Sequence, residues 1–515
     1  MKNKVLKILF FLIVGGVVLL MYSCSQSPEI QTYETSKEAA KVKPDYTGLT
    51  IPPNIAPLNF SVMEDGEKYT VRISQKDKEE NKIEIVSKSK DILIPHKQWS
   101  KLLKQANGST IQYEILVKND NQKWIQYQKF SNTVAKEMID PYIAYRFMKP
   151  IYTWWKDISI QQKNLENHET RLLMSGMDFK NGCINCHSFI NNKPETFALG
   201  YRSTHYGVGT LYIKDKHIEK IGNKWGYTAW HPSGKLAAYS LNKVFQFFHT
   251  AGIEIRDVID LDSAIAYYDV ETRQTETVPA LSDKNRMETY PCWTPDGKYL
   301  YFCSGEILWE NRNIVPPKEY AQVRYDLMRV GYDLENNCWG QAEIVISSKE
   351  TGKSIMLPRI SPDGKYLLFC MCDYGCFPIF QPSSDLYLLE ISSGQYKHLD
   401  INSDYSESWH SWSSNSHWVA FSSKRNGGNF TRTFLSYVDE EGKFSKPFIM
   451  PQQDPSWYDR TLETFSVPEF ITGAVEVCPE ALAMAAMKKD KIESQTPISG
   501  ATPKTKPQDW EQIRE

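Results

Sequence analysis

The sequence predicts a mainly β protein in which a small β-sandwich precedes a β-propeller of about six blades. Four copies of a strand, tight turn and strand unit begin at Trp230, Trp293, Ile360 and Trp412. Upstream, short runs of alternating apolar and polar residues are typical of half-buried strands. The aromatic content of 13%, with 29 Tyr and 14 Trp, also favours sheets.

Residues 1–23 have the pattern of an export signal. Three lysines precede the apolar run Ile8–Met21, and small residues follow it. Cys24 comes next and is the predicted lipidation site, so residues 24–43 would form a polar tether. The alternative is an uncleaved anchor helix, although the run is shorter than the about 20 residues of a membrane span. Both interpretations hold the remainder outside the cytoplasm, at a membrane surface.

Residues 44–135 predict a β-sandwich of immunoglobulin or fibronectin type. Alternating runs at 69–73, 82–86, 111–117 and 124–127 predict strands, and clusters of Asn, Gly and Ser separate them. One short helix is expected at 96–106. Nothing in this domain has a catalytic pattern, so its expected role is that of a spacer and docking surface.

Residues 136–196 are interpreted as a haem-binding segment of short helices and loops. It contains one Cys-x-x-Cys-His motif, formed by Cys183, Cys186 and His187. This spacing lets two thiols add to the two vinyl groups of a porphyrin while the imidazole binds the iron, so it predicts one covalent haem c. The alternatives are a chance motif, a zinc half-site and a redox dithiol. Zinc would need a second ligand pair, and none follows at the usual spacing.

Residues 197–475 predict the propeller. The repeats, spaced by 63, 67 and 52 residues, each carry a Pro-x-Gly-type turn between strands, degenerate in the last copy. Four strands per repeat are typical of propeller blades. Two further blades are expected at 197–213 and 434–470, which makes six. Residues 476–515 predict a C-terminal helix and a flexible tail.

These units resemble the TolB-like propeller repeat. Together with Tyr142–Arg146 and Gly182–Phe189, residues 141–470 resemble the exported TolB-like cytochrome proteins of Bacteroidetes. The resemblance implies an envelope lipoprotein of the periplasmic side or outer membrane. Relatives carry His-x-Arg-Gly after the haem motif. Here the segment 200–203 reads Gly-Tyr-Arg-Ser, so Arg202 matches and the histidine does not.

The sixth iron ligand is therefore open. Met177 would give a His/Met site of higher potential, and His205 would give bis-His ligation of lower potential. Five-coordinate iron is a further alternative, and the other candidate ligands are Met174, His231 and His249. Arg202 is expected to pair with a haem propionate.

Three cysteines lie within seven residues, at positions 370, 372 and 376. They could bind a metal, and Cys372 and Cys376 flank a turn that a disulfide could close. Cys370 ends the same strand position as Cys303 in the preceding repeat. This equivalence favours small buried residues over a metal site.

The net charge of −2 gives no argument for binding nucleic acid. Because no phosphate loop or nucleophile motif is present, an electron carrier or binding module is favoured over an enzyme. The predicted function is electron transfer with a redox or envelope protein partner. The alternatives are a haem-dependent oxidoreductase with a substrate site in the propeller and a TolB-like interaction scaffold.

Overall fold

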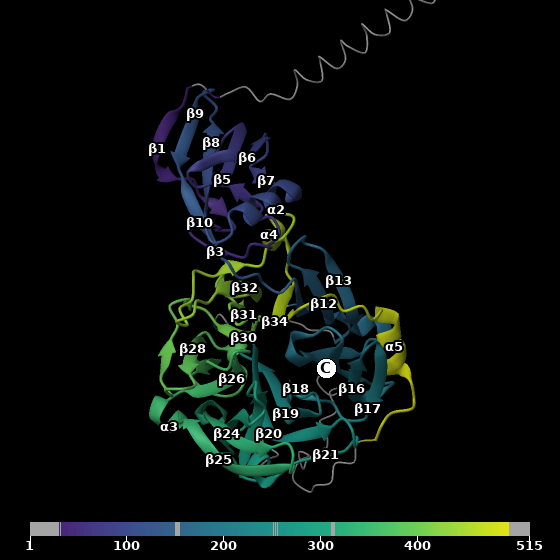
Figure 1. Cartoon of the computed structure of the whole chain (residues 1–515). Coiled ribbons are helices and arrows are strands. Elements are labelled where there is room, and N and C mark those ends of the chain that lie inside the picture. Colours follow the sequence, from purple (N-terminus) through teal and green to yellow (C-terminus); the bar gives the residue numbers. More distant parts are fainter. Residues whose placement is uncertain are drawn as a thin grey trace, which may run out of the picture.

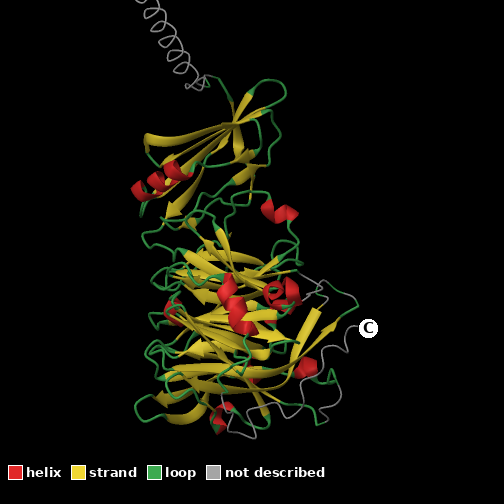
Figure 2. Ribbon diagram, turned by 90° about the vertical axis from the view of Figure 1, so that its right-hand side faces the viewer, coloured by secondary structure: helices red, strands yellow, loops and turns green. Residues whose placement is uncertain are grey.

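The computed structural model describes residues 30, 32–149, 155–250, 252, 254, 256–310 and 315–493. The predicted signal peptide, Cys24 and the tail after residue 493 lie outside the described residues. A small N-terminal β domain stands on a larger propeller (Figure 1). The view from the side shows that strands dominate both parts (Figure 2).

The N-terminal domain contains two sheets and one helix. The larger sheet has seven strands, in the order β1-β9-β8-β10-β3, with β5 and β6 attached through β8. The smaller sheet has the order β2-β4-β7, and helix α2 (His96–Gln105) covers β5 and β6. The strands are β1 (Glu34–Ala39), β2 (Val42–Lys43), β3 (Thr50–Ile51), β4 (Phe60–Val62), β5 (Lys68–Gln75), β6 (Lys78–Ser87), β7 (Asp91–Ile92), β8 (Thr110–Lys118), β9 (Trp124–Gln128) and β10 (Phe130–Val134).

The predicted tether is wrong over residues 34–43, which form strands β1 and β2. β1 pairs in parallel with β9, and five of its six side chains are exposed. Its attachment therefore depends on backbone hydrogen bonds at a sheet edge, not on apolar burial. Such a strand carries no apolar alternation, which is why its sequence reads as a polar linker.

Six four-stranded sheets follow, and each forms one blade. Blade 1 has the order β13-β12-β11-β34, and the other five each use four consecutive strands. The strands are β11 (Tyr142–Met148), β12 (Ser159–Asn164), β13 (Thr170–Ser175) and β34 (Thr464–Ile471) in blade 1; β14 (Cys183–Phe189), β15 (Thr196–Ser203), β16 (Gly207–Lys214) and β17 (His217–Ile221) in blade 2; β18 (Gly226–Trp230), β19 (Leu236–Phe248), β20 (Arg256–Asp269) and β21 (Thr275–Glu276) in blade 3; β22 (Arg286–Trp293), β23 (Tyr299–Glu306), β24 (Tyr325–Asp333) and β25 (Cys338–Ile346) in blade 4; β26 (Ser354–Ile360), β27 (Tyr366–Cys372), β28 (Asp385–Glu390) and β29 (Tyr396–His398) in blade 5; and β30 (Glu407–Trp412), β31 (Trp418–Ser423), β32 (Arg432–Tyr437) and β33 (Phe448–Ile449) in blade 6.

The blades close into a ring through the last strand of the chain. The innermost strands β34, β14, β18, β22, β26 and β30 contact one another in this order, and β30 contacts β34 again. The predicted number of six blades is therefore confirmed. The expected blade at 434–470 is wrong, because β32 and β33 complete blade 6 while β34 joins β11 of blade 1.

The described residues of the segment 136–196 form β11 to β14, with short 3-10 turns between some of them, in place of the expected short helices and loops. β11 is buried on both faces. Its adjacent residues Ile143 and Ala144 point to opposite faces of the sheet, and both are fully buried. A strand buried on both faces lacks the alternation that marks a half-buried one. The short helical elements of the propeller and its C-terminal extension are η1 (Trp155–Asp157), η2 (Gly176–Phe179), η3 (Ile190–Asn192), η4 (Pro279–Leu281), η5 (Tyr320–Gln322), η6 (Pro378–Phe380), α3 (Ser348–Thr351), α4 (Trp457–Arg460) and α5 (Pro479–Met487).

The repeated turn has the left-handed corner that the sequence predicts. Gly234, Gly297 and Gly364 have φ values of +77°, +73° and +75°. In the degenerate fourth copy, Ser416 takes this position with φ of +66°. His231 occupies the start of the first of these turns, and its Nε2 lies 3.2 Å from the carbonyl oxygen of Gly297 in the next blade. This imidazole therefore joins two blades, which is a structural role.

The N-terminal domain contacts blades 1 and 6, next to the closure of the ring. Tyr46 Oη donates to the carbonyl of Ile449, and Trp418 Nε1 donates to the carbonyl of Glu137. Asp140 accepts hydrogen bonds from the backbone and the hydroxyl of Ser414. One apolar core runs continuously from this domain into blades 1, 4, 5 and 6.

Candidate functional site: the central cavity

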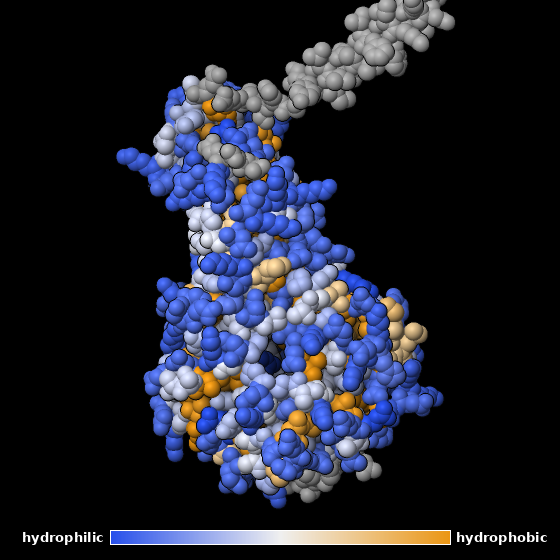
Figure 3. All heavy atoms as spheres, viewed as in Figure 1, coloured by the Kyte–Doolittle hydropathy of each residue, from blue (hydrophilic) through white to orange (hydrophobic). Residues whose placement is uncertain are grey.

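A cavity of about 2470 Å³ lies at the centre of the propeller. All six innermost strands contribute to its wall, and so do loops of blades 2, 5 and 6. The surface of the propeller is hollowed near its middle in the space-filling view (Figure 3). Ligand pockets usually measure about 300–1,000 Å³, so this cavity has room for more than one small group.

Each innermost strand carries a bulge at the same place, and the residue there has a positive φ. Such a conformation costs about 1–3 kcal/mol for a residue other than glycine and persists only where the surroundings enforce it. Some of these bulge residues are aromatic and meet across the propeller axis. The rings of Tyr227 and Trp409, from opposite blades, lie 5.7 Å apart. The six residues, from blade 1 to blade 6, are Val467, Cys186, Tyr227, Tyr290, Leu357 and Trp409.

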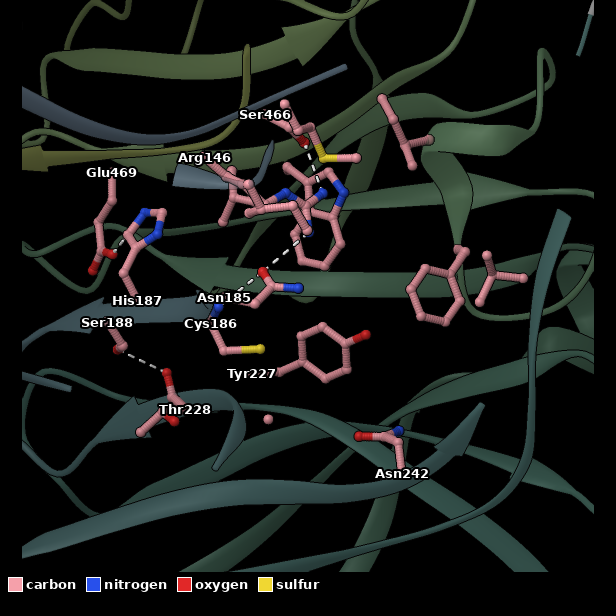
Figure 4. A pocket seen from close by; sticks show the side chains of 18 of the residues that line it. Arg146, Asn185, Cys186, His187, Ser188, Tyr227, Thr228, Asn242, Ser466 and Glu469 are labelled. Carbon is pink, nitrogen blue, oxygen red and sulfur yellow. Dashed lines mark hydrogen bonds and ion pairs between the residues drawn. The ribbon is translucent and has the colours of Figure 1, made fainter. Parts of the chain in front are cut away.

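The Cys-x-x-Cys-His motif lies on β14, the innermost strand of blade 2. Cys186 is the bulge residue, half-buried with φ of +55°, and Cys183 is 3% exposed. Both thiols are free of disulfides and both line the cavity. The motif that the sequence singled out therefore stands on the wall of the central cavity (Figure 4).

His187 is enclosed between blades 1 and 2. Its side chain is 1% exposed, and neither ring nitrogen has a hydrogen-bond partner among the described residues. Burial, together with the charge of Arg146, lowers the pKa of His187 to about 4. The imidazole is therefore neutral near pH 7, with a nitrogen lone pair available to a metal.

Glu469 is the nearest carboxyl to His187, and 3.7 Å separate its Oε2 from the imidazole Nε2 (Figure 4). The backbone N–H of Phe189 donates to its other oxygen at 2.8 Å. Although 22% of the Glu469 side chain is exposed, burial of the carboxyl raises its pKa to about 8. The pair is therefore largely uncharged near pH 7 and forms no strong ion pair.

Arg146, on β11, is the cation next to the motif. Its Nη1 donates to Asn185 Oδ1 at 3.0 Å and its Nη2 to Ser466 Oγ at 3.4 Å (Figure 4). Burial lowers the pKa of this guanidinium. Sequence reasoning gave Arg146 no role, although a charged residue within an otherwise apolar strand was the available signal.

The other predicted site residues differ in their location and in whether they line the cavity. Arg202 pairs with Cys183 across β14 and β15, and its Nη2 lies 3.9 Å from the Cys183 sulfur. His205 is exposed on the β15–β16 turn and contributes to the cavity lining. Met177 is 64% exposed on η2 and does not belong to that lining, whereas Met174 is fully buried in the core.

A long hairpin of blade 3 reaches across the cavity. Glu254, between β19 and β20, forms an ion pair with Lys424 of the opposite blade 6. Tyr374 of blade 5 donates from its hydroxyl to Asp257 Oδ2 at 2.6 Å. The hairpin is thereby fastened to two other blades and covers part of the cavity.

The donor set fits a covalently attached haem. Two free thiols three residues apart stand beside a neutral imidazole whose nitrogens are buried without partners, and a large cavity adjoins them. The enclosure of His187 sets one condition, since a rotation of this side chain or of Glu469 is needed before its nitrogen can reach a ligand in the cavity.

The remaining cysteines do not form a second centre. All described cysteines are free of disulfides, and Cys370, Cys372 and Cys376 are buried in the core. Within the described part of the chain, no cluster of three or more His, Cys, Asp or Glu side chains could hold a metal ion. Within the same part, no helix is long and apolar enough to cross a membrane.

No protein-family model matches the chain, and no curated protein matches it. Several solved structures resemble it at low identity. TolB from Acinetobacter baumannii is 16% identical over 71% of this chain and 79% of its own, with a TM-score of 0.40. An oligogalacturonate lyase in complex with manganese is 11% identical over 59% of this chain and 72% of its own, with a TM-score of 0.34.

A third structure, Kuenenia stuttgartiensis hydrazine synthase, is 12% identical over 52% of this chain and 68% of its own, with a TM-score of 0.29. All three similarities are too weak to support an argument about function. The chain is a mainly β protein with a six-bladed propeller, and TolB is among the solved structures that it resembles.

Proposed function

We propose that this protein is a monohaem c-type cytochrome of the cell envelope, anchored to a membrane by lipid at Cys24, which transfers electrons to or from a protein partner. The observation that carries the proposal is the coincidence of Cys183, Cys186 and an unpartnered His187 on the wall of the central cavity. When bound, haem supplies one-electron redox chemistry.

The residues of the chain have distinct roles in this proposal. The two thiols are the attachment points, and His187, neutral near pH 7, is the proximal ligand. The aromatic side chains at the axis, among them Tyr227 and Trp409, exclude water from an apolar ligand. Arg202 is the proposed partner of a propionate.

The distal ligand is His205 or Met177, or the position stays open. His205 is favoured because it contributes to the cavity lining, whereas Met177 does not. Bis-His ligation lowers the reduction potential relative to His/Met ligation. A spectrum of the reduced protein separates these alternatives.

An interaction scaffold is the second candidate, and one observation favours it. His410 holds in blade 6 the place that His187 holds in blade 2, and its Nε2 lies 2.9 Å from the carbonyl oxygen of Leu368. A histidine at this position therefore has a structural use in the fold. Under this alternative, His187 would be a packing residue and the propeller would bind a protein partner without haem.

The decisive experiment expresses the full chain with its export signal and a c-haem maturation system, and then tests for haem that survives denaturing electrophoresis. We expect haem staining in the unaltered protein and its loss in Cys183→Ala and Cys186→Ala. Cys292→Ala is the matched control, because Cys292 lines the same cavity outside the motif. No haem in the unaltered protein, or equal loss in the control, rejects the proposal in favour of the scaffold.

Two further measurements complete the test: the optical spectrum of the haem and the attachment of lipid at Cys24. A low-spin spectrum in both oxidation states supports electron transfer, and high-spin iron that takes up carbon monoxide favours the haem-dependent oxidoreductase. Cys24→Ser is expected to abolish labelling by fatty acid and to release the protein from membranes. If the Cys24→Ser variant still partitions with membranes, the proposed lipid anchor is contradicted.

A further inference from the structure

Arg146 is a cation on the cavity wall whose charge no described carboxylate compensates. Within the described residues, no Asp or Glu oxygen lies within salt-bridge reach of its guanidinium, and the side chains that accept its hydrogen bonds, Asn185 and Ser466, are both neutral. Its Nε is buried and has no hydrogen-bond partner at all. A buried charge without a partner is costly, so the fold retains it against a penalty.

The surroundings increase that penalty. Arg256, on β20 of blade 3, lines the same cavity, and burial together with the charge of Arg146 lowers its pKa to about 10. Glu254, which forms an ion pair with Lys424, also counteracts this lowering at Arg256, whereas no described carboxylate does so at Arg146. Two guanidinium groups that raise each other's energy in one cavity favour an anion between or beside them.

The geometry of Arg146 leaves a defined face for such an anion. β11 is held between β34 and β12, which fixes the backbone of Arg146, and the hydrogen bonds to Asn185 and Ser466 orient the guanidinium plane. The side chain is half-buried and belongs to the cavity lining. Because Nε is buried, the donors left for a ligand are the Nη1 and Nη2 hydrogens that Asn185 and Ser466 do not use, and together they suit the two oxygens of a carboxylate.

We propose that Arg146 binds a carboxylate of a ligand held in the central cavity. The carboxylate comes from one of two sources: a propionate of the haem, in which case this inference rests on the proposed function, or a free carboxylic acid, in which case it is independent of haem. The site is distinct from Arg202, which lies at the far end of β15 beside Cys183.

The first arm of the test uses protein without haem, prepared as the Cys183→Ala/Cys186→Ala variant of the full chain. Succinate is the probe, and the neutral diamide of succinate is the control ligand. We expect succinate, but not the diamide, to raise the thermal midpoint, and Arg146→Gln to abolish the rise. Arg146→Lys keeps the charge but loses the fork, so we expect at least a tenfold weaker apparent affinity.

Lys224→Gln is the matched control, because Lys224 is a half-buried cation of the same cavity lining. If both substitutions weaken succinate equally, the effect is general electrostatics and the proposal is overturned. Circular dichroism of each variant without ligand checks the fold, and Arg146→Lys keeps the test valid if Arg146→Gln does not fold.

The second arm uses the haem-loaded protein and measures succinate binding and the reduction potential. If the carboxylate is a propionate, loading abolishes succinate binding, and Arg146→Gln lowers the potential because it removes a positive charge beside the haem. If the carboxylate is free, succinate binds with and without haem. No succinate effect in the first arm together with an unchanged potential in the second overturns the inference. Failure of haem attachment alone rejects only the proposed function, since the first arm needs no haem.

Discussion

His187 and His410 occupy the same position in blades 2 and 6. Each follows the positive-φ residue of its innermost strand, Cys186 or Trp409, and each lies against the backbone of the preceding blade at its own positive-φ residue. Burial lowers the pKa of both, to about 4 for His187 and about 3 for His410. The difference is that His410 Nε2 lies 2.9 Å from the carbonyl oxygen of Leu368 and its Nδ1 lies 3.9 Å from Cys370 Sγ, whereas no described residue meets hydrogen-bond geometry at either nitrogen of His187.

This difference predicts unequal effects of the same substitution. In protein prepared without haem, we expect His410→Gln to lower the free energy of unfolding by about 1–3 kcal/mol, because it disrupts a buried hydrogen bond. His187→Gln should cost less, since no bond is lost. Urea unfolding followed by tryptophan fluorescence measures both. An equal loss would assign His187 the packing role of His410 and would weaken the cytochrome proposal.

A buried carboxyl in blade 4 should make stability depend on pH. Glu288 is 2% exposed, and burial raises its pKa from 4.5 to about 8. The folded state then keeps a proton that the unfolded state releases, so the free energy of unfolding falls as pH rises from about 5 to about 8. One proton corresponds to a slope of at most about 1.4 kcal/mol per pH unit.

Glu288→Gln should flatten that slope and leave stability below pH 4.5 nearly unchanged, because both residues are neutral there. Glu306→Gln, on the neighbouring strand, is the control for an exposed carboxylate. Denaturant unfolding at a series of pH values measures the slopes. An unchanged slope in Glu288→Gln would show that Glu288 is already ionised in the folded state.

The number of blades was predicted correctly but one of the six was misplaced, because the sequence does not show how the ring closes. The Pro-x-Gly-type turns mark four blades because the left-handed corner needs particular residues, and Gly297 and Gly364 take that conformation. β34 pairs with β11 more than 300 positions away, and no local pattern records such a partner. The same closure explains why the first part of 136–196, predicted as short helices and loops, forms β11, β12 and β13 of a blade whose remaining strand, β34, is at the other end of the chain.

The candidate site, like the fold, could be predicted from the sequence only in part. Local spacing predicts Cys183, Cys186 and His187, and the fold brings all three to the cavity. Glu469 and Ser466 come from β34, at the other end of the chain, and meet the motif and Arg146 only through the closed ring. Residues joined by long-range pairing carry no signature in a single sequence, so the surroundings of the motif had to come from the structure.

Closure by β34 should also dominate the stability of the ring. Phe470 is fully buried on β34, opposite Ile143 of β11. We expect Phe470→Ala to lower the free energy of unfolding by about 3–5 kcal/mol, because it leaves a cavity where the two ends of the propeller meet. Leu462→Ala is the control, since Leu462 is 66% exposed just before the strand. A comparable loss in both variants would mean that burial of Phe470 on the closing strand does not make a special contribution to the free energy of unfolding.

Two glycines with similar backbones separate conformational strain from steric contact. Gly297 and Gly352 have φ values of +73° and +68°, so alanine at either position pays about 1–2 kcal/mol for the left-handed conformation. An added Cβ at Gly352 has no neighbour within 4 Å, whereas at Gly297 it would meet the imidazole of His231 at a distance no real contact allows.

We therefore expect Gly297→Ala to lower the free energy of unfolding by a further 1–3 kcal/mol, about the cost of overpacking a filled site, relative to Gly352→Ala. The added loss should be smaller when His231 is also replaced by alanine, because the new Cβ at position 297 then has no imidazole to clash with. Urea unfolding of Gly297→Ala, Gly352→Ala, His231→Ala and Gly297→Ala/His231→Ala measures the two losses and the coupling. Equal losses at the two glycines, with no coupling to His231, would mean that the imidazole moves aside without cost and does not hold blades 3 and 4 together.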